Sequence, residues 1–242
     1  MSSRQHFDVL AFGAHPDDVE VAVGGTIVKL ARKGLSVLLV DLTRGEPSRY
    51  GLPGERHAQA MKASEIMGVK RVTLTVQDRL IVDAVEPRIE VARLIRTHRP
   101  RIVFTTAGEG VHPDHKAVTD IVVNGVFYAR LPKWGELGAG ERLKGTNPHE
   151  IDRLFFGHCR MEPAWDRFDF GVDVTDVYEV KKAAIRAYES VFSGERASLL
   201  DKYSAEDRYI GSLCGVKYAE PFRSRGPLLV ADPEVFLKTQ FG

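Results

Sequence analysis

Short apolar runs alternate with amphipathic segments through the first half of the chain. The apolar runs are rich in β-branched and aromatic residues, which favours buried strands, and the segments between them have helical periodicity. The predicted strands are residues 7–13, 36–42, 69–76 and 101–106, and the predicted helices are residues 19–33, 55–67, 86–97 and 114–128. This alternation predicts an α/β fold: a Rossmann-like, doubly wound and mostly parallel sheet with helices on both faces.

The pattern is weaker in the second half. Residues 131–150 are rich in proline, glycine and charge, which predicts a flexible loop and suggests a lid. Residues 154–158 and 168–172 are candidate strands at the sheet edge, 177–192 and 204–213 are candidate helices, and the remainder reads as a tail. We expect one α/β domain over residues 1–242.

Composition narrows the class of protein. Of 242 residues, 43% are hydrophobic and 28% are charged, and the net charge is +1, so neither disorder nor nucleic-acid binding is favoured. No basic leader and no apolar stretch near the roughly 18 residues of a membrane span is present. Cys159 and Cys214 form no CxxC pair. These features predict a cytoplasmic protein without a disulfide framework.

Polar side chains cluster where the first and fourth predicted strands end. The first cluster is His15, Asp17, Asp18 and Glu20, and the second is Glu109, His112, Asp114 and His115. Ligands of open α/β sheets bind at the carboxyl ends of parallel strands. Both clusters should therefore lie along the same edge of the sheet.

Three of these residues form a possible metal-binding set. If the two strands lie near one another, His15, Asp18 and His115 supply two imidazoles and one carboxylate. Zinc and Fe(II) both accept such a set, which leaves a position open for water. The sequence therefore predicts a metal site at this edge.

The remaining cluster residues suit hydrolysis. Asp17, adjacent to a predicted ligand, could take a proton from water. A protonated His112 could stabilise a tetrahedral oxyanion and then protonate the leaving group, and Asp114 could orient His112 and keep it cationic. The combination predicts metal-assisted hydrolysis of an amide or ester.

Other interpretations stay open. Aspartates before helices are common N-caps, and a single histidine at a strand end is more often structural than a ligand. The same three ligands could serve Fe(II)-dependent oxygen chemistry, or a structural metal in a non-catalytic sugar-binding module. The chain has no GxGxxG fingerprint and no phosphate loop, which disfavours a nucleotide cofactor.

Two arginines are candidate substrate ligands. Arg44 follows the second predicted strand, and Arg56 lies at the start of the second predicted helix. An arginine in these positions could bind an anionic or polyol substrate, although an exposed arginine is more often solvated surface.

The two motifs together resemble a known family. The string AHPDDVE after the first strand, with HPDH after the fourth, resembles the PIG-L (LmbE-like) family of zinc-dependent N-acetylglucosaminyl deacetylases. The resemblance implies zinc held by His15, Asp18 and His115. It also implies Asp17 as general base and His112 as the acid or oxyanion partner.

The resemblance extends over nearly the whole chain. DLTRGE, ASEIMGV, AYESVF and GVKYAEPFRSRGPLL are similar to segments of the bacillithiol-pathway branch, which deacetylates N-acetylglucosaminyl-malate. The resemblance implies this small-molecule amino-sugar substrate, a sugar-binding role for Arg56 and a homo-oligomer, a hexamer by analogy. The branch has an arginine, a candidate partner of the malate carboxylates, where this chain has Val111. The alternatives are that Arg44 compensates or that the substrate is another N-acetylglucosamine derivative such as a chitobiose-like sugar.

Overall fold

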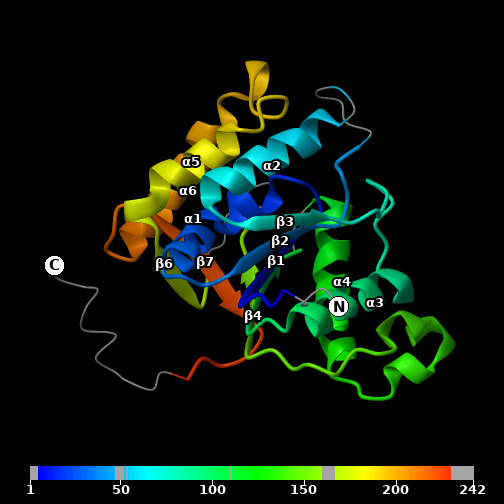
Figure 1. Ribbon diagram of the computed structural model, residues 1–242. Coiled ribbons are helices and arrows are strands. Elements are labelled where there is room, and N and C mark those ends of the chain that lie inside the picture. Colours follow the sequence, from blue (N-terminus) through cyan, green and yellow to red (C-terminus); the bar gives the residue numbers. More distant parts are fainter. Residues whose placement is uncertain (1–4, 47–51, 53, 109–110, 160–166, 230–242) are drawn as a thin grey trace.

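The architecture is a single sheet with helices on both faces (Figure 1). The structure is a computed structural model and describes residues 5–46, 52, 54–108, 111–159 and 167–229. Within these ranges the strand order is β3-β2-β1-β4-β5-β7-β6. The strands are β1 Val9–Gly13, β2 Val37–Asp41, β3 Lys70–Thr73, β4 Ile102–Thr106, β5 Arg153–Gly157, β6 Phe170–Asp173 and β7 Ala219–Ser224.

The longer helices connect these strands. They are α1 Asp18–Arg32, α2 Glu55–Met67, α3 Val85–His98, α4 Pro113–Ala129, α5 Tyr178–Arg186 and α6 Leu199–Leu213. Short 3₁₀ turns are η1 Trp134–Glu136, η2 Gly138–Leu143, η3 Thr175–Val177 and η4 Gly194–Arg196. None of the described helices is long and apolar enough to cross a membrane.

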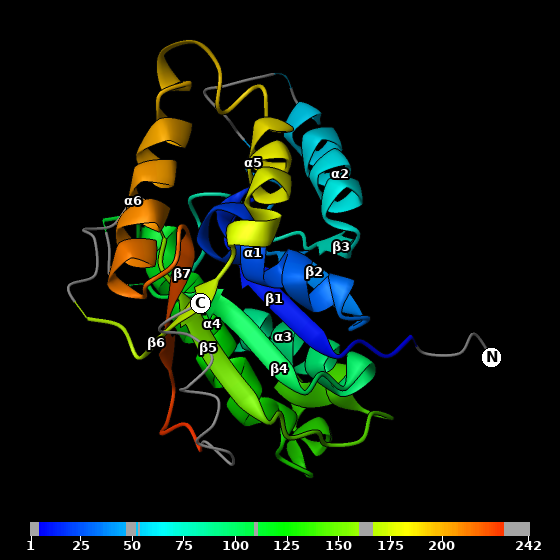
Figure 2. The same cartoon turned by 90° about the vertical axis from the view of Figure 1, so that its left-hand side faces the viewer.

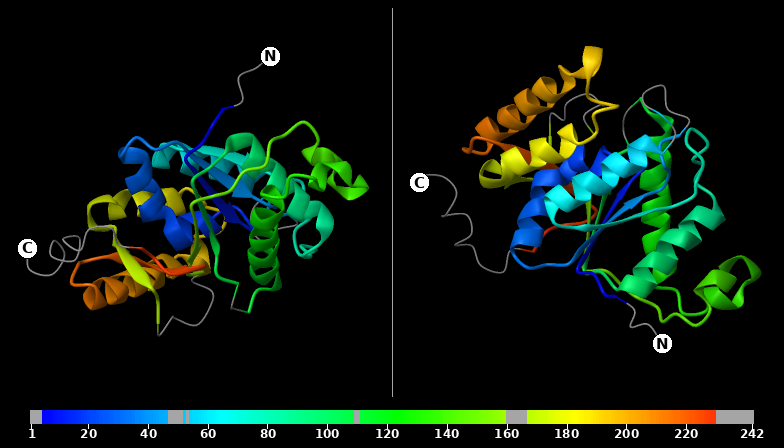
Figure 3. Two further views of the ribbon diagram at one scale, coloured as in Figure 1. Left: turned by 90° about the horizontal axis from the view of Figure 1, so that it is seen from below. Right: turned by 45° about the horizontal axis from the view of Figure 1, so that its top comes forward.

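Alternate side chains of the central strands form two separate cores. Along β1, Val9 and Ala11 belong to the core beneath α1, α2 and α5. Leu10 and Phe12 belong to the core beneath α3 and α4. Because successive strand residues point to opposite faces, a strand covered on both sides must be apolar throughout. Figures 2 and 3 show the two helical layers on either side of the sheet.

The order of the strands determines where a ligand can bind. β1 pairs in parallel with β2 on one side and with β4 on the other. The chain leaves β1 through α1 towards β2, and leaves β4 through α4 towards β5. The turns after β1 and β4 therefore diverge, and the crevice between them is the switch point at which open α/β sheets bind ligands.

The predicted fold class is confirmed, but the prediction for the last strand was wrong. The sequence pattern places residues 219–224 in a tail, yet β7 pairs antiparallel with both β5 and β6 inside the sheet. Pro221, which pairs with Gly171, weakens the strand signal because proline is rare in paired strands. The predicted helix over 177–192 is also shorter and ends at Arg186.

Residues 131–150 lie away from the edge where the two polar clusters meet. The segment starts where α4 ends and leads to the first residue of β5, both at the amino edge of the sheet. Arg96 of α3 donates to the carbonyls of Ala129 and Leu131, and His149 bonds to the carbonyl of Pro100. The structure therefore does not support the expected lid.

Candidate metal centre

The two predicted polar clusters meet at the switch point. β1 and β4 are direct neighbours, with Val9 opposite Ile102 and Phe12 opposite Thr105. His15 lies in the turn after β1, and His115 lies in the first turn of α4. The sequence prediction required that these two strands be adjacent, and they are.

His15, Asp18 and His115 converge on one point. Asp18 Oδ2 is 3.5 Å from His15 Nδ1, and Asp18 Oδ1 is 3.2 Å from His115 Nε2. One donor atom from each residue lies within 4.8 Å of the others, and all three residues are buried. Tetrahedral zinc with bonds of about 2.1 Å places its donors about 3.4 Å apart. The donor set and its spacing therefore fit a metal ion.

The electrostatics of the set also favour an added cation. Burial lowers the pKa of His115, but the Asp18 carboxylate outweighs it and raises the pKa to about 11. Burial raises the pKa of Asp18, and the two imidazoles more than reverse this, so that its pKa is well below the usual range. A divalent ion supplies the positive charge that this arrangement stabilises.

A second set, His15, His112 and Asp114, also brings donors within the same limit. The hydrogen-bond partners of His15 show which of the two sets is the better candidate for the metal site. His15 Nε2 lies 3.0 Å from Asp78 Oδ1 and 3.1 Å from Asp114 Oδ2. Ligating histidines commonly donate their other N–H to a carboxylate. This favours Nδ1 as the metal-binding atom of His15 and the set with Asp18 and His115.

Asp78 was not predicted from the sequence. It follows β3, whose carboxyl end lies at the same edge of the sheet, so applying the strand-end rule to the third strand would have singled it out. His15 lowers the pKa of Asp78 against the opposing effect of burial. Asp78 helps to fix the ring of His15.

Asp114 does not contact His112 in the predicted way. The bond between them runs from the Asp114 backbone amide to His112 Nδ1, at 3.3 Å. The Asp114 carboxylate instead bonds to His15 and accepts from the backbone amide of Arg79. Burial, together with His115 and His15, lowers the pKa of His112. The carboxylate therefore orients His15, and in the neutral form of His112 the proton lies on Nε2, because Nδ1 accepts from the Asp114 amide.

Asp17 is held beside the metal-binding set in a strained conformation. Its φ is 105°, in the left-handed region that non-glycine residues avoid. Arg56 Nη2 donates to Asp17 Oδ1 at 2.8 Å, and Arg56 Nε and Nη2 donate to the Pro16 carbonyl at 3.1 and 2.8 Å. Burial raises the pKa of the Asp17 carboxyl, and Arg56 offsets part of this effect. A raised pKa suits a carboxylate that must accept a proton.

A network behind the cluster anchors the first turn of α1. Glu20 accepts from Arg71 of β3 and, at 2.7 Å, from the hydroxyl of Tyr188. Arg71 also pairs with Asp41 at the end of β2. Burial raises the pKa of Glu20 to about 6. Since Glu20 belongs to the same turn as Asp17 and Asp18, this network fixes the position of both carboxylates.

The comparisons with known proteins identify the family of this chain. Residues 10–126 match the model of the PIG-L family, described as GlcNAc-PI de-N-acetylase. The diacetylchitobiose deacetylase of Thermococcus kodakarensis is 33% identical over 228 residues, which cover 89% of this chain and 82% of the relative. The chain belongs to the PIG-L family.

Two further proteins, one curated relative and one solved structure, are similar to this PIG-L chain. The probable N-acetyl-alpha-D-glucosaminyl L-malate deacetylase 2 of Bacillus cereus is 34% identical over 143 residues, which cover 52% of this chain and 62% of the relative. The crystal structure of a conserved protein from Thermus thermophilus superposes with a TM-score of 0.82 at 35% identity, covering 93% of this chain and 97% of the other. The PIG-L match includes both motifs and their strands.

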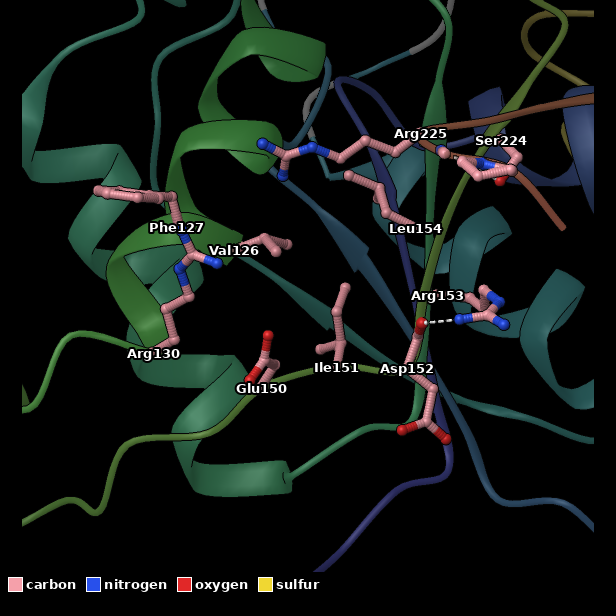
Figure 4. Close-up of a pocket in the computed structure, with 12 residues that line it drawn as sticks. Val126, Phe127, Arg130, Glu150, Ile151, Asp152, Arg153, Leu154, Ser224 and Arg225 are labelled. Carbon is pink, nitrogen blue, oxygen red and sulfur yellow. Dashed lines mark hydrogen bonds between the residues drawn. The ribbon is translucent and has the colours of Figure 1, made fainter. Parts of the chain in front are cut away.

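A cavity of about 360 Å³ lies at the opposite edge of the sheet (Figure 4). It is bounded by the end of α4, the start of β5 and the residues after β7, and both arginines and carboxylates line it. The charged residues are Arg130, Glu150, Asp152, Arg153 and Arg225. The metal-binding set of this PIG-L protein lies at the carboxyl edge instead, so this cavity is not part of the candidate centre.

Replacing Arg56 with lysine is expected to lower turnover by about tenfold and leave metal affinity unchanged. A lysine keeps the charge but cannot make the fork of bonds to Pro16 and Asp17 that maintains the strained turn. Steady-state kinetics with metal content measured in parallel would check this. Lys62 on the same helix has an exposed side chain, and Lys62→Arg is the control. Unaltered turnover in Arg56→Lys would show that the fork does not position Asp17.

Proposed function

We propose that this PIG-L protein is a metal-dependent hydrolase that removes the N-acetyl group from an N-acetylglucosamine conjugate. The observation that carries the proposal is the convergence of His15, Asp18 and His115 at the switch point, with Asp17 directly beside them. Two imidazoles and one carboxylate, a set of three protein ligands, are typical of catalytic zinc, whereas structural zinc has four. Among its relatives are deacetylases of two different glucosamine conjugates.

Bound zinc would supply Lewis-acid polarisation of the acetamide carbonyl and a lowered pKa for water. Asp17 accepts the proton that water loses as its oxygen bonds to the carbonyl carbon. His112, whose Nδ1 accepts from the Asp114 amide, donates through Nε2–H to the oxygen that becomes negative. The C–N bond then breaks, and the proton that Asp17 took from water passes to the nitrogen. The products are acetate and a free amine.

The substrate-binding residues are also proposals. Arg44 is exposed in the turn after β2, at the carboxyl edge of the sheet, and its contact with a bound conjugate is proposed from this position. Arg56 is already engaged with Asp17 and Pro16, so contact with the sugar would be a second role. Val111 is 85% exposed beside His112 and offers no charge to an anionic aglycone.

The experiment is acetate release from three substrates by protein of measured zinc content. N-acetylglucosaminyl-malate, diacetylchitobiose and N-acetylglucosamine would be compared, before and after chelation. The proposal predicts release that disappears with the metal and returns when zinc is restored. Release from the malate conjugate alone would support a place in bacillithiol biosynthesis, and release from diacetylchitobiose would support the chitobiose-like alternative. No release from any of them would contradict the proposal.

Three finer proposals follow the family resemblance. We propose zinc as the native metal with Fe(II) as the alternative, a cytoplasmic location, and a homo-oligomer that is a hexamer by analogy. Metal analysis of protein purified without added metal tests the first proposal. Light scattering gives the mass of the particle, and a mass equal to that of one chain would contradict the last.

A further inference from the structure

Cys159 lies against Nδ1 of His115, the ring nitrogen that faces away from the metal-binding set. It follows β5, whose last residue Gly157 pairs with Thr106 of β4 and accepts a bond from the amide of Ala107. This pairing brings the chain after β5 to the carboxyl edge beside the first turn of α4. The Cys159 sulfur is 3.1 Å from His115 Nδ1, and Cys159 is buried.

The two nitrogens of the His115 ring therefore have different partners. Nε2 lies 3.2 Å from Asp18 Oδ1, inside the metal-binding set. Nδ1 points away from that set and meets the sulfur. His15 is arranged in the same sense, with one nitrogen towards Asp18 and the other towards the carboxylates of Asp78 and Asp114.

This arrangement has a chemical consequence for metal binding. A neutral imidazole binds a metal through the nitrogen that carries no proton, so the other nitrogen must hold the proton and needs an acceptor. Carboxylates fill this role for His15. For His115 the atom in this position is a sulfur, which is a weak acceptor as a thiol.

We propose that Cys159 is a positioning residue that accepts the Nδ1–H of His115 and so keeps the Nε2 lone pair directed at the metal. The inference rests on the proposed function, because it requires His115 to be a ligand. Cys159 does not bind the metal itself, since its sulfur contacts the side of the ring that faces away from Asp18. In the described part of the chain, the clusters that could hold a metal do not include it.

Zinc affinity of the full chain tests this directly. Chelator-stripped Cys159→Ala, Cys159→Val and Cys159→Ser variants would be titrated with zinc in competition with a chromophoric chelator. Removal of the acceptor in the alanine and valine variants is expected to weaken zinc binding by about 10–100-fold. The serine hydroxyl can still accept the bond, so Cys159→Ser should retain most of the affinity. Valine nearly fills the space of the cysteine, so the test remains available if alanine prevents folding.

The controls separate this role from packing. Cys214 has no contact with the metal-binding set, since it lies beyond α6 and packs against Gly171, and Cys214→Ser should bind zinc like the unaltered protein. Melting temperatures of the metal-free variants report packing alone, and turnover at saturating zinc should change much less than affinity. Unaltered affinity in Cys159→Val, or equal losses in the serine and valine variants, would overturn the inference. Failure of the unaltered protein to bind zinc would overturn the proposed function and this inference with it.

Discussion

Replacing Asp17 with asparagine is expected to lower turnover by about 10²–10⁴-fold while zinc binding is retained. Asparagine keeps the size of the side chain and one oxygen for the bond from Arg56, but it cannot take a proton from water. Asp17 is not one of the converging donors, so metal affinity should not fall. The measurement is acetate release at saturating zinc, with metal content determined in the same samples.

Asp152→Asn is the matched control for this variant. Asp152 precedes β5 at the opposite edge of the sheet and makes an exposed ion pair with Arg101. We expect its turnover to equal that of the unaltered protein. Full turnover in metal-loaded Asp17→Asn would remove Asp17 from the role of base.

Replacing Lys181 with methionine is expected to lower the free energy of unfolding by about 3–5 kcal/mol. Lys181 Nζ lies 2.8 Å from Asp207 Oδ2 and 2.8 Å from Glu220 Oε1, and all three side chains are at most 1% exposed. Glu220 also accepts from the amides of Gly25 and Thr26, so the group joins α1, α5, α6 and β7. Methionine keeps the length of the side chain but leaves two buried carboxylates without their cation.

The neighbouring lysine provides the control. Lys182 pairs with Glu179, whose side chain is 78% exposed, and such a pair contributes about 1 kcal/mol or less. Urea unfolding of Lys181→Met and Lys182→Met, followed by circular dichroism, would compare the two. Equal midpoints in the two variants would show that the buried group of Lys181, Asp207 and Glu220 does not stabilise the junction of α5, α6 and β7.

The first half of the fold was predictable mainly because β1, β2 and β4 are buried on both faces. Such strands are continuous apolar runs, and the runs ending at Gly13 and Thr106 in the structure are two of those predicted. The second half was harder to predict. β7 contains Pro221 and the charged residues Glu220 and Arg223, and its pairing with β5 and β6 depends on contacts distant in the sequence. Local pattern carries no signal for such a strand.

The candidate site was also predictable only in part. The metal-binding set follows from two motifs at the ends of adjacent strands, which is a local signal combined with a rule of topology. The same rule marks Asp78 as a residue at this edge, but it does not show that Asp78 and Cys159 contact the ring nitrogens that face away from the metal. Asp78 and Cys159 reach the histidines from the segments that follow β3 and β5, and the strand pairings that place these segments are not encoded locally in the sequence. The orientation of Asp114 towards His15 rather than His112 depends on the same three-dimensional contacts.

One titration tests the central claim of a catalytic metal at the switch point most directly. Zinc would be added stepwise to chelator-stripped protein and to His115→Ala, while bound zinc and acetate release are measured together. The account predicts one zinc ion per chain in the unaltered protein, acetate release that rises in proportion to occupancy, and loss of both in His115→Ala. Acetate release without metal, or full zinc binding in the variant, would contradict it.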